Sequence, residues 1–234
     1  MIKTSVMEIK RCSYYIRPMR KEDIPQVKEI DREVFPTQWP PPNYQRELQN
    51  QIARLIVACD KSKTVEAPEL KVTPGKGISG LVSRIRWLFN HERFFGNKLL
   101  PSSRQYVVGF ASIWVMANEA HITNIAVRNL YQRQGIGERL LISIIDLVAK
   151  LNVTIITLEV RVSNTPAHSL YNKYGFTQVG VRPGYYTDNR EDALLMSTEN
   201  ITSASFQARF QQLKQAYSQR YGTANKPLTK ISAR

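Results

Sequence analysis

The feature that most constrains this fold is a strand, a loop, a helix and a second strand in direct succession between residues 120 and 160. Apolar residues predict a strand over 120–127, a polar glycine-containing turn follows at 130–137, and an amphipathic helix is predicted over 137–151. A run rich in β-branched residues predicts the next strand over 154–160. Strands and helices that alternate in this way predict a mixed, three-layer α/β fold, in which helices flank a central sheet.

The flanking sequence predicts the rest of this sheet. Proline cannot continue a helix, and Gly175 stands where a left-handed residue ends one. Before residue 120 we expect a strand at 14–17, a helix that ends at Phe35-Pro36, a short helix at 43–51, and a hairpin of strands 54–59 and 106–115. After residue 160 we expect a helix capped by Ser163-Asn164, strands at 176–180 and 192–196, and a helix at 203–221.

The composition indicates one folded domain with appendages. The chain has 234 residues, of which 42% are hydrophobic and 22% charged, and this excludes disorder throughout. Two cysteines are too few for a disulfide framework, and the best apolar run, at 140–149, is too short to span a bilayer. We therefore expect a cytoplasmic protein with one domain at 12–199, followed by a C-terminal helix and a basic flexible tail at 200–234.

The charge and one long insert point to an anionic neighbour. The formal net charge is +14 and the pI about 9.9, which favours a nucleotide cofactor, RNA or a lipid surface without choosing among them. Residues 61–104 are far longer than the hairpin needs, and 80–95 can form a basic amphipathic helix. That helix would dock on a membrane surface, on ribosomal RNA or on a partner protein, or would simply pack onto the domain.

The glycine-containing loop is the clearest candidate for a binding site. Gln132–Gly137 lies between a strand and a helix, so several backbone amides can point into one concavity at the positive end of the helix dipole. This arrangement suits a phosphate anion, and Arg133 and Arg139 add positive charge. The alternative is a plain connection between a strand and a helix. The loop has neither the lysine of a P-loop nor the first glycine of the dinucleotide fingerprint, so ATP and NAD are poor candidates.

The Gln-x-x-Gly-x-Gly pattern resembles the coenzyme A pyrophosphate loop of the GCN5-related N-acetyltransferases (GNAT), and the resemblance extends over residues 105–196. Within that superfamily the sequence is similar to the RimI group, whose members acetylate the N-terminal alanine of a ribosomal protein. The matching blocks are Asn124–Val127, Gln132–Gly137, Leu158–Asn164, Ala167, Leu170-Tyr171 and Gly175-Phe176.

This resemblance implies an acyl-CoA N-acyltransferase fold with the insert between its second and third strands, acetyl-CoA as co-substrate, and no metal. Glu159 would be the proton acceptor and Tyr171 the proton donor. The cofactor would be held by Ile125, Ala126, Val127, Arg133, Gln134, Gly135, Ile136, Gly137, Glu138 and Asn164. A peptide acceptor would be flanked by Phe35, Pro36, Tyr185 and Tyr186.

The acid–base chemistry of acetyl transfer to an amine also requires a proton acceptor and a proton donor. Removing a proton from an α-amine at pH 7 costs about 1 kcal/mol, against about 4.6 kcal/mol for a lysine, so an N-terminus is the easier acceptor. Glu159 can take this proton directly or through a water, and Tyr171 can protonate the departing thiolate. The structural alternatives are a surface or ion-paired glutamate for Glu159 and a core tyrosine with a satisfied hydroxyl for Tyr171. His121 either assists proton removal or is a satisfied histidine of the sheet.

Acceptor residues also have structural alternatives, namely core packing for Phe35 and a half-exposed hairpin for the Tyr185-Tyr186 pair. We predict direct acetyl transfer in a ternary complex to a protein N-terminus. In the RimI group this N-terminus belongs to a ribosomal protein. A lysine or small-amine acetyltransferase, or a module that binds ribosomes, RNA or membranes, stays open. Neither cysteine lies in a matched block, so no covalent acetyl-enzyme is indicated. The sequence does not give the oligomeric state.

Overall fold

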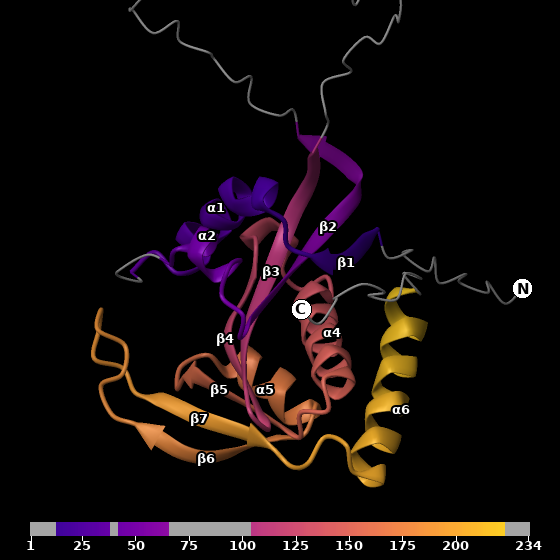
Figure 1. Ribbon diagram of the computed structural model, residues 1–234. Coiled ribbons are helices and arrows are strands. Elements are labelled where there is room, and N and C mark those ends of the chain that lie inside the picture. The colour runs from indigo at the N-terminus through magenta and orange to yellow at the C-terminus, as the bar shows by residue number, and fades with distance from the viewer. Residues whose placement is uncertain (1–12, 38–41, 66–103, 223–234) are drawn as a thin grey trace, which may run out of the picture.

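A seven-stranded mixed sheet forms the centre of the protein (Figure 1). The computed structural model describes residues 13–37, 42–65 and 104–222. Its strands lie in the order β1-β2-β3-β4-β5-β7-β6, and β4 and β5 form the parallel pair among antiparallel neighbours. The strands are β1 (Tyr14–Pro18), β2 (Ala53–Val65), β3 (Arg104–Met116), β4 (Glu119–Val127), β5 (Ile155–Arg161), β6 (Phe176–Arg182) and β7 (Ala193–Thr198).

The helices follow the sequence expectation closely, with one exception. They are α1 (Ile24–Val34), α2 (Tyr44–Glu47), α4 (Ile136–Lys150), α5 (Thr165–Lys173) and α6 (Ala204–Tyr221), with short 3-10 turns at Lys21–Asp23 and Asn129–Tyr131. The prediction of a helix over 43–51 is wrong in its length. Asn43 caps α2, but the helix ends at Glu47. Asn50 accepts a hydrogen bond from the amide of Ile52 at 3.2 Å, and this turn leads the chain into β2.

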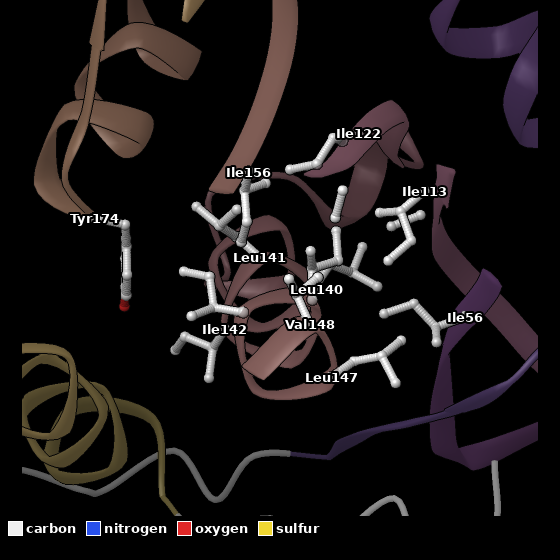
Figure 2. Packing of buried hydrophobic residues seen from close by; sticks show 14 of the residues in the cluster. Ile56, Ile113, Ile122, Leu140, Leu141, Ile142, Leu147, Val148, Ile156 and Tyr174 are labelled. Carbon is white, nitrogen blue, oxygen red and sulfur yellow. The ribbon is translucent and has the colours of Figure 1, made fainter. Parts of the chain in front are cut away.

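Side chains of the central strands alternate between two apolar clusters, which makes the fold three-layered as predicted. Leu55 and Val57 of β2 pack with Val27 and other residues of α1, and we call this group the α1-side cluster. Ile56, between them, packs with residues of α4 on the opposite face, in what we call the α4-side cluster (Figure 2). The sheet is therefore buried on both faces, and α1 and α4 lie on opposite sides of it (Figure 1).

The parallel strands β4 and β5 separate part of the way along their length. Their pairing runs from Glu119–Ile155 to Ile122–Leu158 and stops there. Beyond that point β4 pairs with β3 as far as Val127, and β5 pairs with β7 as far as Arg161. A β-bulge between β3 and β4, at the register shift after Ser112, re-aims β4 where the two strands part. The sheet thus opens in its middle, next to the loop that begins α4.

Two predicted segments lie outside the described residues. The insert helix expected over 80–95 is one, and the basic tail after residue 222 is the other. The arms of the insert are described, because β2 and β3 continue past the expected strands until Val65 pairs with Arg104. Among the helices that the structure describes, none has the length and apolar character needed to cross a membrane.

Candidate active site

The loop before α4 has the backbone geometry that an anion site needs. Gly135 is the N-cap of α4 and adopts the left-handed conformation, with φ of 80°. The amide of Arg139 donates to the carbonyl of Gly135 at 2.9 Å, so the amides of Gly135–Glu138 precede the hydrogen-bond ladder of the helix. These amides lie at the positive end of the helix dipole and can donate to a phosphate oxygen. The loop therefore fits the pyrophosphate of coenzyme A.

Side-chain contacts fix this loop from several directions. Glu138 accepts hydrogen bonds from the Tyr174 hydroxyl at 2.7 Å and from Lys173 Nζ at 2.5 Å. Gln134 Oε1 accepts from the Tyr14 hydroxyl at 2.6 Å. The carboxylate of Glu138 is thus paired with a lysine and does not confront an incoming anion with an uncompensated negative charge.

The strand β4 lines the opening beside β5. Ala126 is buried in the α1-side cluster, while Ile125 and Val127 are partly buried against the α4-side cluster. No residue after Ile122 of β4 pairs with β5 in the described part of the chain, so this side of the strand faces the opening. Backbone groups there can hydrogen-bond an extended pantetheine arm.

Glu159 lies at the opening with both of its carboxylate oxygens engaged. It follows the last paired residue of β5, and its side chain is only 8% exposed. One oxygen is 2.9 Å from His121 Nε2, and the other is 2.9 Å from Arg182 Nη2. The hydrogen bond from His121, together with the charges of His121 and Arg182, lowers the pKa of Glu159 against the opposing effect of burial. Glu159 is therefore a carboxylate at neutral pH.

His121 connects Glu159 to a second carboxylate through a threonine. Its Nδ1 is 2.9 Å from Thr157 Oγ1, and that hydroxyl donates to Glu119 Oε1 at 2.5 Å. These side chains share one face of β4 and β5, because Ala120, Ile122, Ile156 and Leu158 between them are buried on the other face. The structure thus places His121 against Glu159.

Tyr171 and Asn164 come from the helix that follows β5. Asn164 caps α5 by accepting a hydrogen bond from the amide of Ala167 at 3.2 Å, as the sequence predicts. The ring of Tyr171 lies 5.6 Å from that of Phe176, between centroids. Burial, followed by the neighbouring Tyr186, raises the pKa of Tyr171. The phenol therefore keeps its proton at neutral pH.

The aromatic pair Tyr185-Tyr186 lies near Glu159, and each of its rings is next to an arginine. The two rings meet edge to face at 5.2 Å. The guanidinium of Arg182, which pairs with Glu159, lies 5.7 Å from the Tyr185 ring, and that of Arg161 lies 3.8 Å from the Tyr186 ring. Burial raises the pKa of Tyr186 to about 12. Neither arginine was predicted as a site residue from the sequence. Arg161 lies two residues after Glu159 on β5, so the two side chains share one face of the strand.

The loop after α1 is tied to the same region. Phe35 is half-buried and packs against the α1-side cluster, and Pro36 beside it is exposed. The hydroxyl of Thr37 donates to Asp188 at 2.7 Å, and Asp188 in turn accepts two hydrogen bonds from Arg161. The loop after α1 and the connection between β6 and β7 are thus joined beside the opening.

The described residues offer neither a metal site nor a reactive thiol. Among residues 13–37, 42–65 and 104–222, no group of three or more His, Cys, Asp and Glu side chains is suited to hold a metal ion. Cys59 is fully buried in β2, and burial raises the pKa of its thiol to about 11. A thiol in that state is a poor nucleophile.

Comparison with known proteins gives a consistent result. The profile of the Acetyltransferase (GNAT) family matches residues 24–176. A Bacillus subtilis protein that is provisionally named a ribosomal protein bS18-alanine N-acetyltransferase is 32% identical over 77% of this chain and 92% of its own. The Escherichia coli K12 enzyme of that name is 42% identical over 45% of this chain and 72% of its own. A crystal structure of the ribosomal-protein-S18-alanine N-acetyltransferase from E. coli superposes with a TM-score of 0.57 and 25% identity, covering 82% of this chain and 96% of that one.

Proposed function

Since this chain belongs to the Acetyltransferase (GNAT) family, we propose that it transfers the acetyl group of acetyl-CoA to the N-terminal α-amine of a protein. The relatives described above are named, the B. subtilis protein provisionally, as alanine N-acetyltransferases of ribosomal protein bS18, which supports a terminal amine as acceptor. The observation that carries the proposal is Glu159, ionised and paired with His121 where β4 and β5 separate. A ribosomal protein is the acceptor that we propose first.

The loop and the opening supply a site for acetyl-CoA, which brings an activated thioester to the reaction. We assign its pyrophosphate to the backbone of Arg133–Glu138, its pantetheine arm to Ile125–Val127, and a further contact to the Asn164 side chain. The left-handed Gly135 and the paired Glu138 support this assignment, because they leave amide donors and no uncompensated acid at the loop.

Glu159 serves as the proton acceptor, and its contacts with His121 and Arg182 hold the carboxylate in place. A carboxylate with a lowered pKa is by itself a weak base for an ammonium group whose pKa is about 7.7 to 8.0. About a tenth of α-amines with such a pKa are already neutral at pH 7, so the base has to take up only the proton released as the amine attacks. Glu159 attracts the terminal amine and takes its proton, directly or through a water.

Tyr171 serves as the proton donor at the other end of the reaction. Its raised pKa keeps the phenol protonated, so a proton is available when the thiolate departs. Backbone amides on the open side of β4 stabilise the oxyanion of the tetrahedral intermediate, since fixed dipoles in a partly buried site act without reorganisation. Phe35, Pro36, Tyr185 and Tyr186 form the walls that receive the peptide terminus.

The proposal is tested by measuring coenzyme A release with two sets of peptides. One set begins with a free alanine, and the other has an acetylated terminus and offers only lysine. We expect turnover on the free terminus alone, and a loss of about 10²–10⁴-fold in kcat for Glu159→Gln and for Tyr171→Phe. The control is Glu199→Gln, which changes an exposed acid at the end of β7. Turnover only on lysine, or on no peptide despite coenzyme A binding, would refute the N-terminal assignment.

A further inference from the structure

The C-terminal helix α6 reaches the cofactor loop with its last turn. It runs beside α4 (Figure 1) and is joined to the middle of that helix by the ion pair Lys214–Asp146, at 2.7 Å. The hydroxyl of Tyr217 donates to the carbonyl of Gly135 at 3.3 Å. A methyl group at Gly135 would lie 2.7–3.0 Å from three ring carbons of Tyr221, so that ring packs directly on the glycine.

The rest of α6 holds these two tyrosines in place. Ser203 caps the helix by accepting from the amide of Phe206 at 3.2 Å. Phe206 and Phe210 are buried, and the ring of Phe210 lies 6.3 Å from that of Tyr174. Tyr174 also donates to Glu138, so α6 supports the loop through a second route. The rings of Tyr217 and Tyr221 contact each other at a tilt of 37°, with their centroids 4.9 Å apart.

This contact is located at the residue on which the anion site depends. Gly135 carries the left-handed backbone that turns the chain into α4, and the amides that follow it are the proposed pyrophosphate donors. Donors bind an anion well only when they are fixed in direction before it arrives, because ordering a loop on binding reduces affinity. A ring packed on Gly135 and a hydrogen bond to its carbonyl restrict the loop in this way.

We propose that Tyr217 and Tyr221 are positioning residues, which hold the loop before α4 in the conformation that binds the coenzyme A pyrophosphate. The helix α6 thereby contributes to cofactor affinity. This inference rests on the proposed use of acetyl-CoA, and it does not depend on which amine is acetylated. It differs from a purely structural role for α6, in which the helix would stabilise α4 without affecting cofactor affinity.

Binding of coenzyme A to the full-length protein, measured by calorimetry, is the direct test. We expect Tyr221→Ala to raise the Kd about tenfold, and Tyr221→Phe, which keeps the ring, to stay within about twofold of the unaltered protein. The matched control is Lys214→Ala, which removes a contact of α6 that lies away from the loop and should leave the Kd unchanged. An unchanged Kd in Tyr221→Ala, or an equal rise in Lys214→Ala, would overturn the inference.

A second readout separates positioning from general destabilisation. Acetyl-pantetheine is a truncated substrate that lacks the pyrophosphate, so the loop cannot act on it. We expect Tyr221→Ala to raise the KM for acetyl-CoA about tenfold, with kcat and the KM for acetyl-pantetheine unchanged. Equal losses with both substrates would assign α6 a structural role only. Coenzyme A binding without acetylation of any N-terminus would refute the proposed acceptor and leave this inference standing, whereas no binding at all would refute both.

Discussion

Individual residues at the opening of the sheet show what sequence alone can identify. Glu159 and Tyr171 stand in blocks that resemble a known family, and both can be named as candidates from that resemblance. The partners of Glu159 are different, because His121 and Arg182 reach it from other strands. The contact with His121 depends on the register that places His121 opposite Thr157. Spacing along one chain does not contain that register, and so the sequence alone could not show that His121 contacts Glu159.

The carboxylate of Glu191 provides a test at this scale. Hydrogen bonds from Ser163, then from Arg161, lower the pKa of Glu191 from its ordinary 4.5 to about 2. A lowered pKa in the folded state means that the carboxylate stabilises the protein fully above about pH 4.5, and that this contribution is lost as the pH falls toward 2. Glu191→Gln should therefore destabilise the protein near pH 7 and do so progressively less in acid.

Urea unfolding at several pH values between 7 and 3 measures this effect as the difference in unfolding free energy between the two proteins. Glu199→Gln, the exposed acid at the end of β7, serves as the control. A difference for Glu191→Gln that stayed constant across the range would show that its ion pair contributes nothing to the acid sensitivity of the fold.

At the scale of elements, helix boundaries were predictable where a cap or a breaker marks them. Asn164 and Ser203 cap α5 and α6 at the expected positions, and the glycine loop precedes α4. The length of α2 was not predictable, because its end depends on a turn made by the Asn50 side chain. The contact between α6 and the loop was also missed. Helical spacing identified the apolar face of α6 but not the surface that this face covers.

Replacing Gly135 by alanine tests the contact between loop and helix from the other side. The left-handed φ of 80° and the overlap with Tyr221 both oppose a side chain there. The left-handed backbone conformation alone costs a residue with a Cβ atom about 1–2 kcal/mol. We expect Gly135→Ala to weaken coenzyme A binding and to lower the unfolding free energy by at least that amount. In the Tyr221→Ala background the loss of stability should be smaller, because the overlap is gone and the backbone strain remains.

Denaturant unfolding of the single and double variants measures this coupling. Gly137→Ala is the matched control in the same loop, since a methyl group there would meet its nearest described neighbour only at 3.9 Å. Losses of stability that are identical in the two backgrounds would show that Tyr221 does not press on Gly135.

At the scale of the whole molecule, the alternation of strands and helices was sufficient to predict a three-layer fold, because burial on both faces follows directly from the sequence pattern. Leu55 and Ile56 pack on opposite faces as that pattern requires. The order of strands beyond β5 is a different matter. The strand β7 lies between β5 and β6, and no local pattern in either strand encodes this exchange.

The long insert between β2 and β3 should be dispensable for the fold and for the proposed reaction. Val65 and Arg104 are direct cross-strand partners, so a two-residue Asn-Gly turn in place of residues 66–103 should close the hairpin without strain. We expect the shortened protein to keep its Tm and its kcat/KM on alanine peptides within about threefold, because the proposed site residues all lie outside the insert. Thermal unfolding and steady-state kinetics check this. A fall in kcat/KM at unchanged Tm would make the insert part of the acceptor site.

The cofactor loop is held by the two ends of the described chain, since Tyr14 of β1 bonds Gln134 and Tyr221 of α6 packs on Gly135. During synthesis the loop is made long before α6. If the final turn of α6 fixes the loop, a chain whose synthesis has not reached α6 has its proposed catalytic residues and its opening but not its full affinity for coenzyme A. Synthesis of α6 is then the event that gives the cofactor site its full affinity, and a product of translation that stops before α6 binds coenzyme A weakly.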